Sequence, residues 1–403
     1  MKIIFKSIFV RSISSISTLT FTFLGTKLYG LSDVGEFAFF LSLVTFFSML
    51  NGFGMSIPFF LKMKESAPQH KIYLYKELSR IQNKLSILLS ILIILPLLYL
   101  GVDNAILITL SSFIIPKILI NTHVIRSFGH VSKFVFFQLG NIHFFSLPVM
   151  FLANFYNINH HLIDLYFIGT LIHFILSQIY VLRDFSNISL IKKTKALLDY
   201  KRIIKESSEY LTIDLINYIF NWVPVFGIMF FSSSETLGIY YNIIKVGSVF
   251  VILLFLIESI SMDSLKRLAE RIDQRHLIKV KELKRNVLLM STICYLILIF
   301  FGEIILYKIN PILGQYNFSL LIYSFSQIFI LSFGPVAMFM KISENQQTMI
   351  KILSITSAMN TILCFLMIPY LNLIGVFLSI FLSNIFWCFR FKSFIKKNYK
   401  FSL

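Results

Sequence analysis

Three lysines stand inside segments that are otherwise apolar: Lys27, Lys117 and Lys245. No acidic residue lies one helical turn from any of them, so no ammonium group has a neutralising partner on its own helix. An ammonium group in this position can attract phosphate or another anion. Asn121 follows Lys117 by one turn and would add an amide to the same polar patch. Lys27 is close to the end of its segment, where its side chain could instead extend to water.

Two segments carry polar stripes, and the first of them also contains Lys27. The first stripe is Ser7, Arg11, Ser14 and Thr18, and the second is Tyr210, Asp214, Asn217 and Asn221. Both have intervals of four, three and four residues, which place each set on one face of an α-helix. Such stripes either connect packed helices or line a watered cavity. Because each stripe contains a charge, we interpret both as cavity lining, although a single Ser or Thr more often connects helices.

Arg11 and Asp214 occupy matching positions in the two stripes. We expect them to lie at equivalent depths and to act as an inner gate or in ion coupling. Their attraction would be strong wherever water is excluded. The alternative is that each has its own partner nearby.

The segments that carry these residues are predicted to be membrane helices. Of 403 residues 57% are apolar, and the mean hydropathy is +0.79, which a soluble domain of this size could not bury. A helix of about 20 apolar residues crosses a bilayer, and the chain divides at that length into twelve expected spans. They cover about residues 8–29, 35–61, 81–100, 105–125, 134–154, 162–182, 208–231, 237–262, 286–307, 318–340, 349–368 and 371–391.

The basic residues predict the topology. Nearly all Lys and Arg residues fall in every second gap between the spans, and basic gaps stay on the cytoplasmic side. Both termini are therefore expected in the cytoplasm. The formal charge of +18 is explained by this bias and by anionic lipid headgroups, so nucleic-acid binding is not expected.

The two halves of the chain match at an offset of 203 residues. This offset relates Gly35 to Gly238 and Phe37 to Tyr240, and it also relates the two polar stripes. A long basic segment follows the sixth span, so we expect an N-terminal six-helix lobe at residues 1–195 and a C-terminal six-helix lobe at residues 196–403. With six spans in each half, the repeats run in the same direction through the membrane.

Signatures of catalysis are missing from the sequence. No glycine-rich phosphate loop and no metal-ligand spacing of His, Cys and carboxylates occurs, and the gaps on the outer side are short. We therefore expect no catalytic residue, no cofactor and no bound metal, and we do not expect an enzyme.

Residues 25–37 resemble the exit of the first helix in bacterial polysaccharide exporters. Those proteins carry a basic residue, Leu-Gly, a short polar turn, and a Gly followed by an aromatic residue. Here Lys27 stands where Arg is usual, and Tyr29 precedes Gly30. Residues 234–240 resemble the family's second repeat, and residues 368–376 resemble its last turn. The chain is thus similar to O-antigen or capsule repeat-unit flippases, in the polysaccharide branch of the multidrug and oligosaccharidyl-lipid exporter superfamily.

The resemblance implies an all-α polytopic membrane protein. About twelve transmembrane helices would form two parallel-repeat six-helix lobes, arranged as a V around a central, often cationic cavity. The protein would reside in the bacterial cytoplasmic membrane and move a polyprenyl-pyrophosphate-linked oligosaccharide to the outer leaflet by alternating access. Further expected partners are membrane lipids and other polysaccharide assembly proteins. We assign to the substrate cavity Lys27, Lys117, Asn121, Lys245, Ser14, Thr18, Asn217 and Asn221.

Other functions remain open at this point. A cation-coupled multidrug exporter of the same superfamily should contain more buried acids than lysines, and the residue count favours the flippase. A membrane sugar polymerase or ligase is disfavoured by the short outer gaps, and a structural scaffold by the repeated polar stripes. The sequence does not distinguish proton, sodium or potential coupling.

Overall fold

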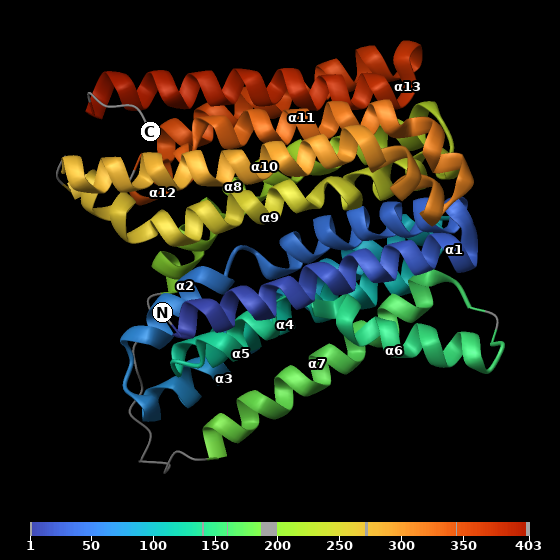
Figure 1. Ribbon diagram of the computed structural model, residues 1–403. Helices are drawn as coiled ribbons and strands as arrows, with labels where there is room; N and C mark the ends of the chain where they lie inside the picture. Colours follow the sequence, from blue (N-terminus) through green and yellow to red (C-terminus); the bar gives the residue numbers. More distant parts are fainter. Residues whose placement is uncertain are drawn as a thin grey trace. The chain divides into compact units, whose positions relative to one another are not determined.

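The chain folds into α-helices joined mostly by short connections (Figure 1). The computed structural model describes residues 2–138, 141–158, 160–186, 200–270, 273–343 and 345–399, and these ranges contain no β-strand. The first helices are α1 (Lys2–Gly52), α2 (Ser56–Glu65), α3 (Pro68–Tyr99), α4 (Ala105–Ser127), α5 (Val131–Phe136), α6 (Ile142–Phe155) and α7 (Leu162–Ser186). The later ones are α8 (Tyr200–Phe231), α9 (Ser234–Glu270), α10 (Gln274–Ile309), the 3-10 helix η2 (Pro311–Tyr316), α11 (Asn317–Phe333), α12 (Val336–Ile342) and α13 (Gln346–Tyr399).

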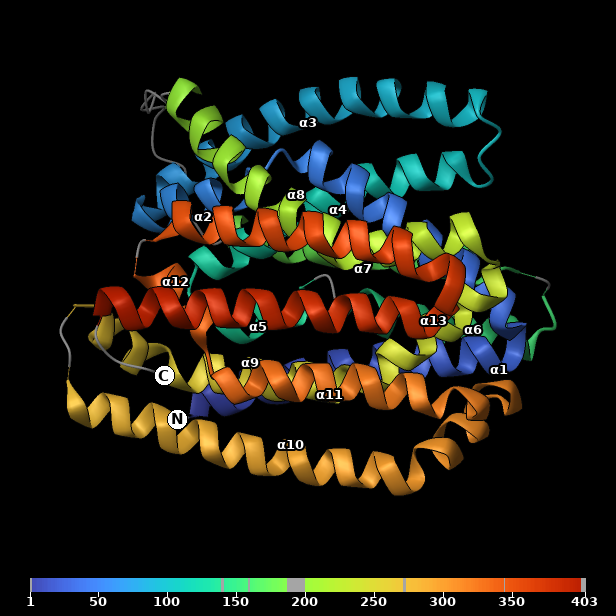
Figure 2. The same cartoon turned by 90° about the horizontal axis from the view of Figure 1, so that it is seen from above.

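Two of these helices are each two helices joined at a kink. The kink in α1 is at Gly30, with φ 91° and ψ 175°, and the kink in α13 is at Asn372, with φ 48° and ψ −130°. Glycine adopts a positive φ without a steric penalty, and asparagine is one of the few other residues that tolerate it. Figure 2 shows α13 folding back on itself. Each kink replaces one of the short outer gaps expected from the sequence.

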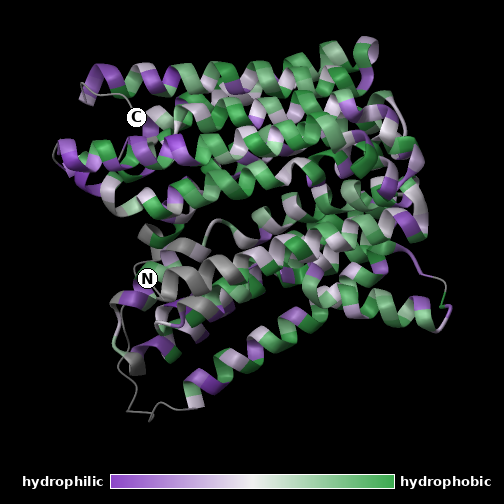
Figure 3. Cartoon of the chain, viewed as in Figure 1, coloured by the Kyte–Doolittle hydropathy of each residue, from purple (hydrophilic) through white to green (hydrophobic). Residues whose placement is uncertain are grey.

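The helices confirm the predicted all-α polytopic membrane fold. Within the described part of the chain, nine helices are long and apolar enough to cross a membrane. When α1 and α13 are each counted as two and the shorter apolar helix α6 is added, the total is twelve crossings. Hydrophobic residues predominate along most helices (Figure 3).

Three of the expected spans are interrupted. The second ends at Gly52 and resumes as α2, the fifth is divided into α5 and α6, and the tenth is divided into α11 and α12. Gly54 and Gly334 have positive φ at two of these breaks, and Pro335 cannot donate a backbone hydrogen bond. The helices also extend past the apolar spans, so α3 begins at Pro68 rather than near residue 81.

The chain forms two compact units. Unit 1 is Met1–Thr22 with Phe39–Leu215, and unit 2 is Phe23–Ala38 with Ile216–Leu403. Helices α1 and α8 therefore each contribute to both units. The expected boundary between residues 195 and 196 lies outside the described residues, within 187–199.

Each unit has its own apolar core. In unit 1, Met63, Val124, Ile125 and Phe137 are almost fully buried where α2, α4 and the end of α5 pack together. In unit 2 the corresponding core comes from α9, α12 and α13, through side chains such as Leu265, Phe339 and Phe391. Burying side chains of this size stabilises each unit by about 1.5–3 kcal/mol per residue where water is displaced.

Within unit 2, the kinked part of α1 and the start of α9 cross at two glycines. A Cβ atom at Gly35 would collide with the carbonyl oxygen of Ser234, and a Cβ atom at Gly238 would collide with that of Leu31. The offset of 203 residues relates Gly35 to Gly238 and also Leu31 to Ser234. The contact is therefore reciprocal, as expected where two copies of an internal repeat meet.

We predict that Gly35→Ala or Gly238→Ala will destabilise the protein by about 1–3 kcal/mol, because the added methyl group must push the two backbones apart. Thermal unfolding in detergent measures the loss. Gly52→Ala is the matched control, since its Cβ would meet Pro116 at an ordinary 3.6 Å. Equal melting temperatures for all three variants would contradict the close crossing.

Candidate substrate-binding site

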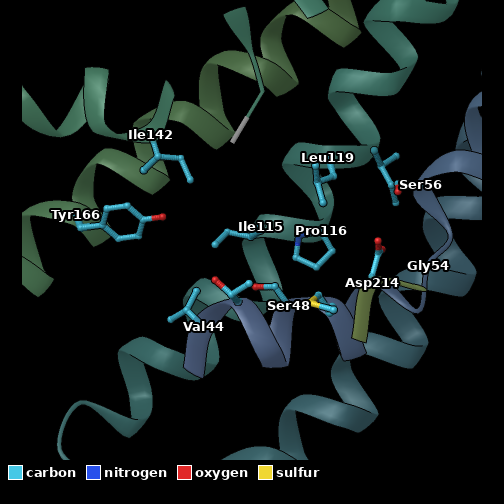
Figure 4. Close-up of a pocket in the computed structure, with 14 residues that line it drawn as sticks. Val44, Ser48, Gly54, Ser56, Ile115, Pro116, Leu119, Ile142, Tyr166 and Asp214 are labelled. Carbon is cyan, nitrogen blue, oxygen red and sulfur yellow. The ribbon is translucent and has the colours of Figure 1, made fainter. Parts of the chain in front are cut away.

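A pocket of about 180 Å³ lies within unit 1 and contains Asp214 (Figure 4). Its walls come from α1, α2, α4, α6, α7 and α8, and its polar side chains include Thr45, Ser48, Tyr166 and Asp214. Figure 4 draws Tyr166 and Asp214 on opposite sides of the pocket, with Ile115 and Pro116 between them. With Ser56, the pocket thus offers one carboxylate and four hydroxyl groups on largely apolar walls.

Gly54 explains how α8 reaches this pocket. It has a φ of 64°, and a Cβ atom there would collide with the carbonyl oxygen of Ser207 and approach the backbone nitrogen of Leu211 at 2.7 Å. The break between α1 and α2 therefore lets the chain pass directly against the start of α8. Asp214 follows one turn after Leu211 and so lines the pocket.

Lys117 and Asn121 lie elsewhere in unit 1. They line a groove of about 460 Å³ between α3, α4 and α7, which we call the lysine groove. Its other lining residues are Tyr75, Lys76, Ser79, Arg80, Gln82, Asn83, Lys84, Ile87, Ile120, Phe174 and Gln178. Pro116 lines the Asp214 pocket, whereas Lys117 lines the groove, because successive residues of a helix point about 100° apart. Helix α4 therefore separates the two sites.

The side chain of Asn121 is hydrogen-bonded to other residues inside the protein. Its Nδ2 donates to Ser177 Oγ at 3.0 Å and to Gln178 Oε1 at 3.1 Å, and its Oδ1 accepts from Tyr75 Oη at 3.0 Å. Both of its N–H groups are used, and the side chain is buried. Asn121 therefore joins α3, α4 and α7 at the base of the lysine groove.

Two of the three span lysines contact an aromatic ring one turn earlier on the same helix. The Nζ of Lys117 lies 3.7 Å from the ring centroid of Phe113, and that of Lys245, in unit 2, lies 4.5 Å from that of Tyr241. A cation over an aromatic face is stabilised by about 2 kcal/mol when it is poorly hydrated. Lys27 is exposed and lies three residues before the Gly30 kink.

The polar stripes make mostly local hydrogen bonds. Thr18 Oγ1 donates to the carbonyl oxygen of Ser14, which is buried, and lies 3.4 Å from His143 Nδ1 on α6. Asn221 Nδ2 donates to the carbonyl oxygen of Asn217 at 2.7 Å. Asn217 and Asn221 belong to unit 2, whereas Ser14, Thr18 and Asp214 belong to unit 1. The side chain of Arg11 lies outside the described residues.

Sequence reasoning missed several residues of these sites. Lys76 and Arg80 fall in an expected basic gap and Lys84 near the start of the next expected span, but α3 places all three at four-residue intervals on one helix face. The four-residue spacing in the sequence already indicates that the three basic residues share one helix face. Tyr166, Thr45 and Gln178 had no such signal, because polar residues of this kind are common in packed spans.

The architecture defines a multi-pass membrane protein built from twelve helical crossings. Comparison with solved structures shows which fold this is. An inward closed conformation of the lipid II flippase MurJ matches with a TM-score of 0.72 and 18% sequence identity, over 98% of this chain and 87% of that one. An inward-facing multidrug resistance MATE family transporter of the MOP superfamily matches with a TM-score of 0.68 and 11% identity, over 98% of both chains.

A MOP superfamily transporter from Pyrococcus furiosus also matches, with a TM-score of 0.61 and 10% identity, over 98% of this chain and 93% of that one. The chain therefore has the fold of MOP superfamily transporters. No protein-family model matches its sequence. No curated protein matches it either.

We predict that Asn121→Leu will destabilise the protein by about 1–2 kcal/mol, because it leaves Tyr75, Ser177 and Gln178 without the hydrogen bonds described above. Thermal unfolding in detergent measures this. Asn221→Leu is the control, since Asn221 is exposed and its described hydrogen bond is to a carbonyl on its own helix. If Asn121→Leu unfolds at the wild-type temperature, Asn121 does not hold the three helices together.

Proposed function

We propose that the protein is a flippase that moves a polyprenyl-pyrophosphate-linked oligosaccharide from the cytoplasmic to the outer leaflet by alternating access. The observation that carries the proposal is the set of span lysines. Among the described residues, no carboxylate lies within ion-pair distance of Lys27, Lys117 or Lys245. A pyrophosphate group would supply the negative charge that these ammonium groups lack.

The fold supports a cargo of this kind. A flippase for lipid II shares the architecture of this chain over nearly its whole length. The glycan part of such a substrate needs a hydrated path, whereas its polyprenyl tail can stay in the lipid. Polar side chains on apolar membrane helices could provide that hydrated path next to the lipid. An inside-negative membrane potential would favour outward movement of an anion by about 2.3 kcal/mol per charge per 100 mV.

The proposal places the protein in the bacterial cytoplasmic membrane with both termini in the cytoplasm. Its substrate path would include Lys27, Lys117, Lys245 and the polar stripe residues Ser14, Thr18, Asn217 and Asn221. Asn121 would hold together the helices that carry Lys117 and its neighbours. Membrane lipids and other polysaccharide assembly proteins are the further proposed partners.

A second candidate is a cation-coupled multidrug exporter. The observation that favours it is Asp214, an exposed carboxylate that lines a pocket together with hydroxyl groups. MATE family transporters also share the fold. A carboxylate pocket would bind a proton or a metal cation, whereas the lysines would repel one. The two functions therefore predict different substrates for the same purified protein.

We predict that Lys245→Ala will lower the transport of a fluorescent polyprenyl-pyrophosphate oligosaccharide at least about fivefold, because it removes one cation from the phosphate path. Proteoliposomes containing the purified protein measure this directly. Lys245→Arg should retain most of the transport. Lys308→Ala is the control, since Lys308 lies at the end of α10 and is exposed. Transport of a cationic drug by the wild-type protein, without transport of the glycolipid, would instead establish the exporter.

The proposed gate between Arg11 and Asp214 has its own test. We predict that Arg11→Asp and Asp214→Arg will each reduce transport in the same proteoliposomes, and that the double variant will recover it, because opposite charges are restored. A double variant no better than either single variant would rule out the pair. It would leave the lysine assignment unaffected.

A further inference from the structure

The lysine groove is strongly cationic. Lys76, Arg80 and Lys84 on α3 and Lys117 on α4 all line it, and no acidic side chain is among its described lining residues. None of these four cations lies within ion-pair distance of a carboxylate in the part of the chain that the structure describes. Four like charges around about 460 Å³ repel each other unless an anion joins them.

Two of the four charges, those of Lys84 and Lys117, lie at nearly one level of the helix pair. Helices α3 and α4 are joined by a short turn around Val102 and pack against each other (Figure 2). Lys84 is 18 positions before Val102 and Lys117 is 15 positions after it. At 1.5 Å per residue their depths differ by only about 5 Å. The groove thus lies where the basic half of α3 meets its apolar half.

The polar base of the groove leaves donors for a ligand. Gln178 accepts a hydrogen bond from Asn121 through its Oε1 atom, which also lies 3.3 Å from Tyr75 Oη. Its N–H₂ group has no partner among the described residues, and Gln178 lines the groove. The groove therefore combines ammonium and guanidinium groups with an amide donor, which is the set that binds phosphate oxygens.

The surface beyond the groove is apolar. Ile87 lines its edge and is 52% exposed, and Ile91 and Leu95 follow on the same face of α3 at 52% and 62%. On α7, Ile175 and Ile179 flank Gln178 and are also exposed. Side chains of this kind contact lipid tails in a membrane protein. A soluble anion would gain nothing from them, whereas a lipid would bury its acyl or prenyl chain there.

We infer that the lysine groove binds the phosphate headgroup of a membrane lipid, with the lipid chain lying along Ile87, Ile91 and Leu95. Both an anionic phospholipid and a polyprenyl phosphate have this chemistry. The site is separate from the Asp214 pocket, because α4 lies between them. The groove shares Lys117 with the proposed substrate path, but the inference requires no transport, since a lipid can bind there in a protein that moves no glycolipid.

Native mass spectrometry of the purified full-length protein tests the inference. The protein is titrated in detergent with phosphatidylglycerol or polyprenyl phosphate, with diacylglycerol as the phosphate-free control and glycerol phosphate as the chain-free control. We expect at least one phosphate lipid to be retained, and both controls to be retained at least about tenfold less. The lipid that is retained more strongly, phosphatidylglycerol or polyprenyl phosphate, identifies which class of lipid the groove binds. Equal retention of diacylglycerol or of glycerol phosphate would overturn the inference.

Substitutions locate the bound lipid in the groove. Arg80→Gln, Lys84→Gln and Lys117→Gln should each weaken retention about fivefold, and the triple variant should weaken it about a hundredfold. Lys117→Arg keeps the charge and should bind like the wild type, which separates loss of charge from loss of fold. Lys279→Gln is the matched control on α10, where Glu282 lines the same surface pocket. Wild-type retention by Lys117→Gln, with an unchanged melting temperature, would contradict the site.

Discussion

A polar group inside a membrane needs a partner within the protein, and this constraint organises most of the described structure. The protein meets it in two ways. Hydroxyl groups such as those of Thr109 and Thr170 donate to carbonyl oxygens one turn back on their own helices. Some amides instead connect different helices, as Asn121 does between α3, α4 and α7. The first arrangement satisfies the hydroxyl group within one helix, whereas the second also holds neighbouring helices together.

Two of the span lysines, Lys117 and Lys245, meet the same constraint through aromatic rings. Phe113 and Tyr241 stand four residues before Lys117 and Lys245, so the long lysine side chain can bend back over the ring of its own helix. A ring lowers the cost of holding the cation without cancelling its charge. An ion pair with a carboxylate would cancel it. The protein thus keeps positive charge inside its helices, available to an anionic ligand.

The sequence predicted the number and nature of the spans because apolar length and basic gaps are strong signals in a membrane protein. It also predicted an internal repeat, and the offset of 203 residues relates Gly35 to Gly238, the two glycines that meet at the reciprocal crossing. It did not predict the breaks at Gly54 and Gly334, since a glycine within an apolar span does not reveal its φ angle. Nor did it separate Lys117 from Asp214, because the rotation of α4 depends on packing with α3 and α7.

Helices α1 and α8 each belong to both units, so neither unit is a single continuous segment of the chain. The backbone passes from one unit to the other after Thr22, after Ala38 and after Leu215. A cut in residues 187–199 would therefore produce two fragments, neither of which contains a complete unit. The N-terminal fragment would lack residues 200–215, and the C-terminal fragment would lack residues 23–38. Neither fragment should fold alone, yet each carries the segment that the other is missing, so the two should assemble when they are produced together.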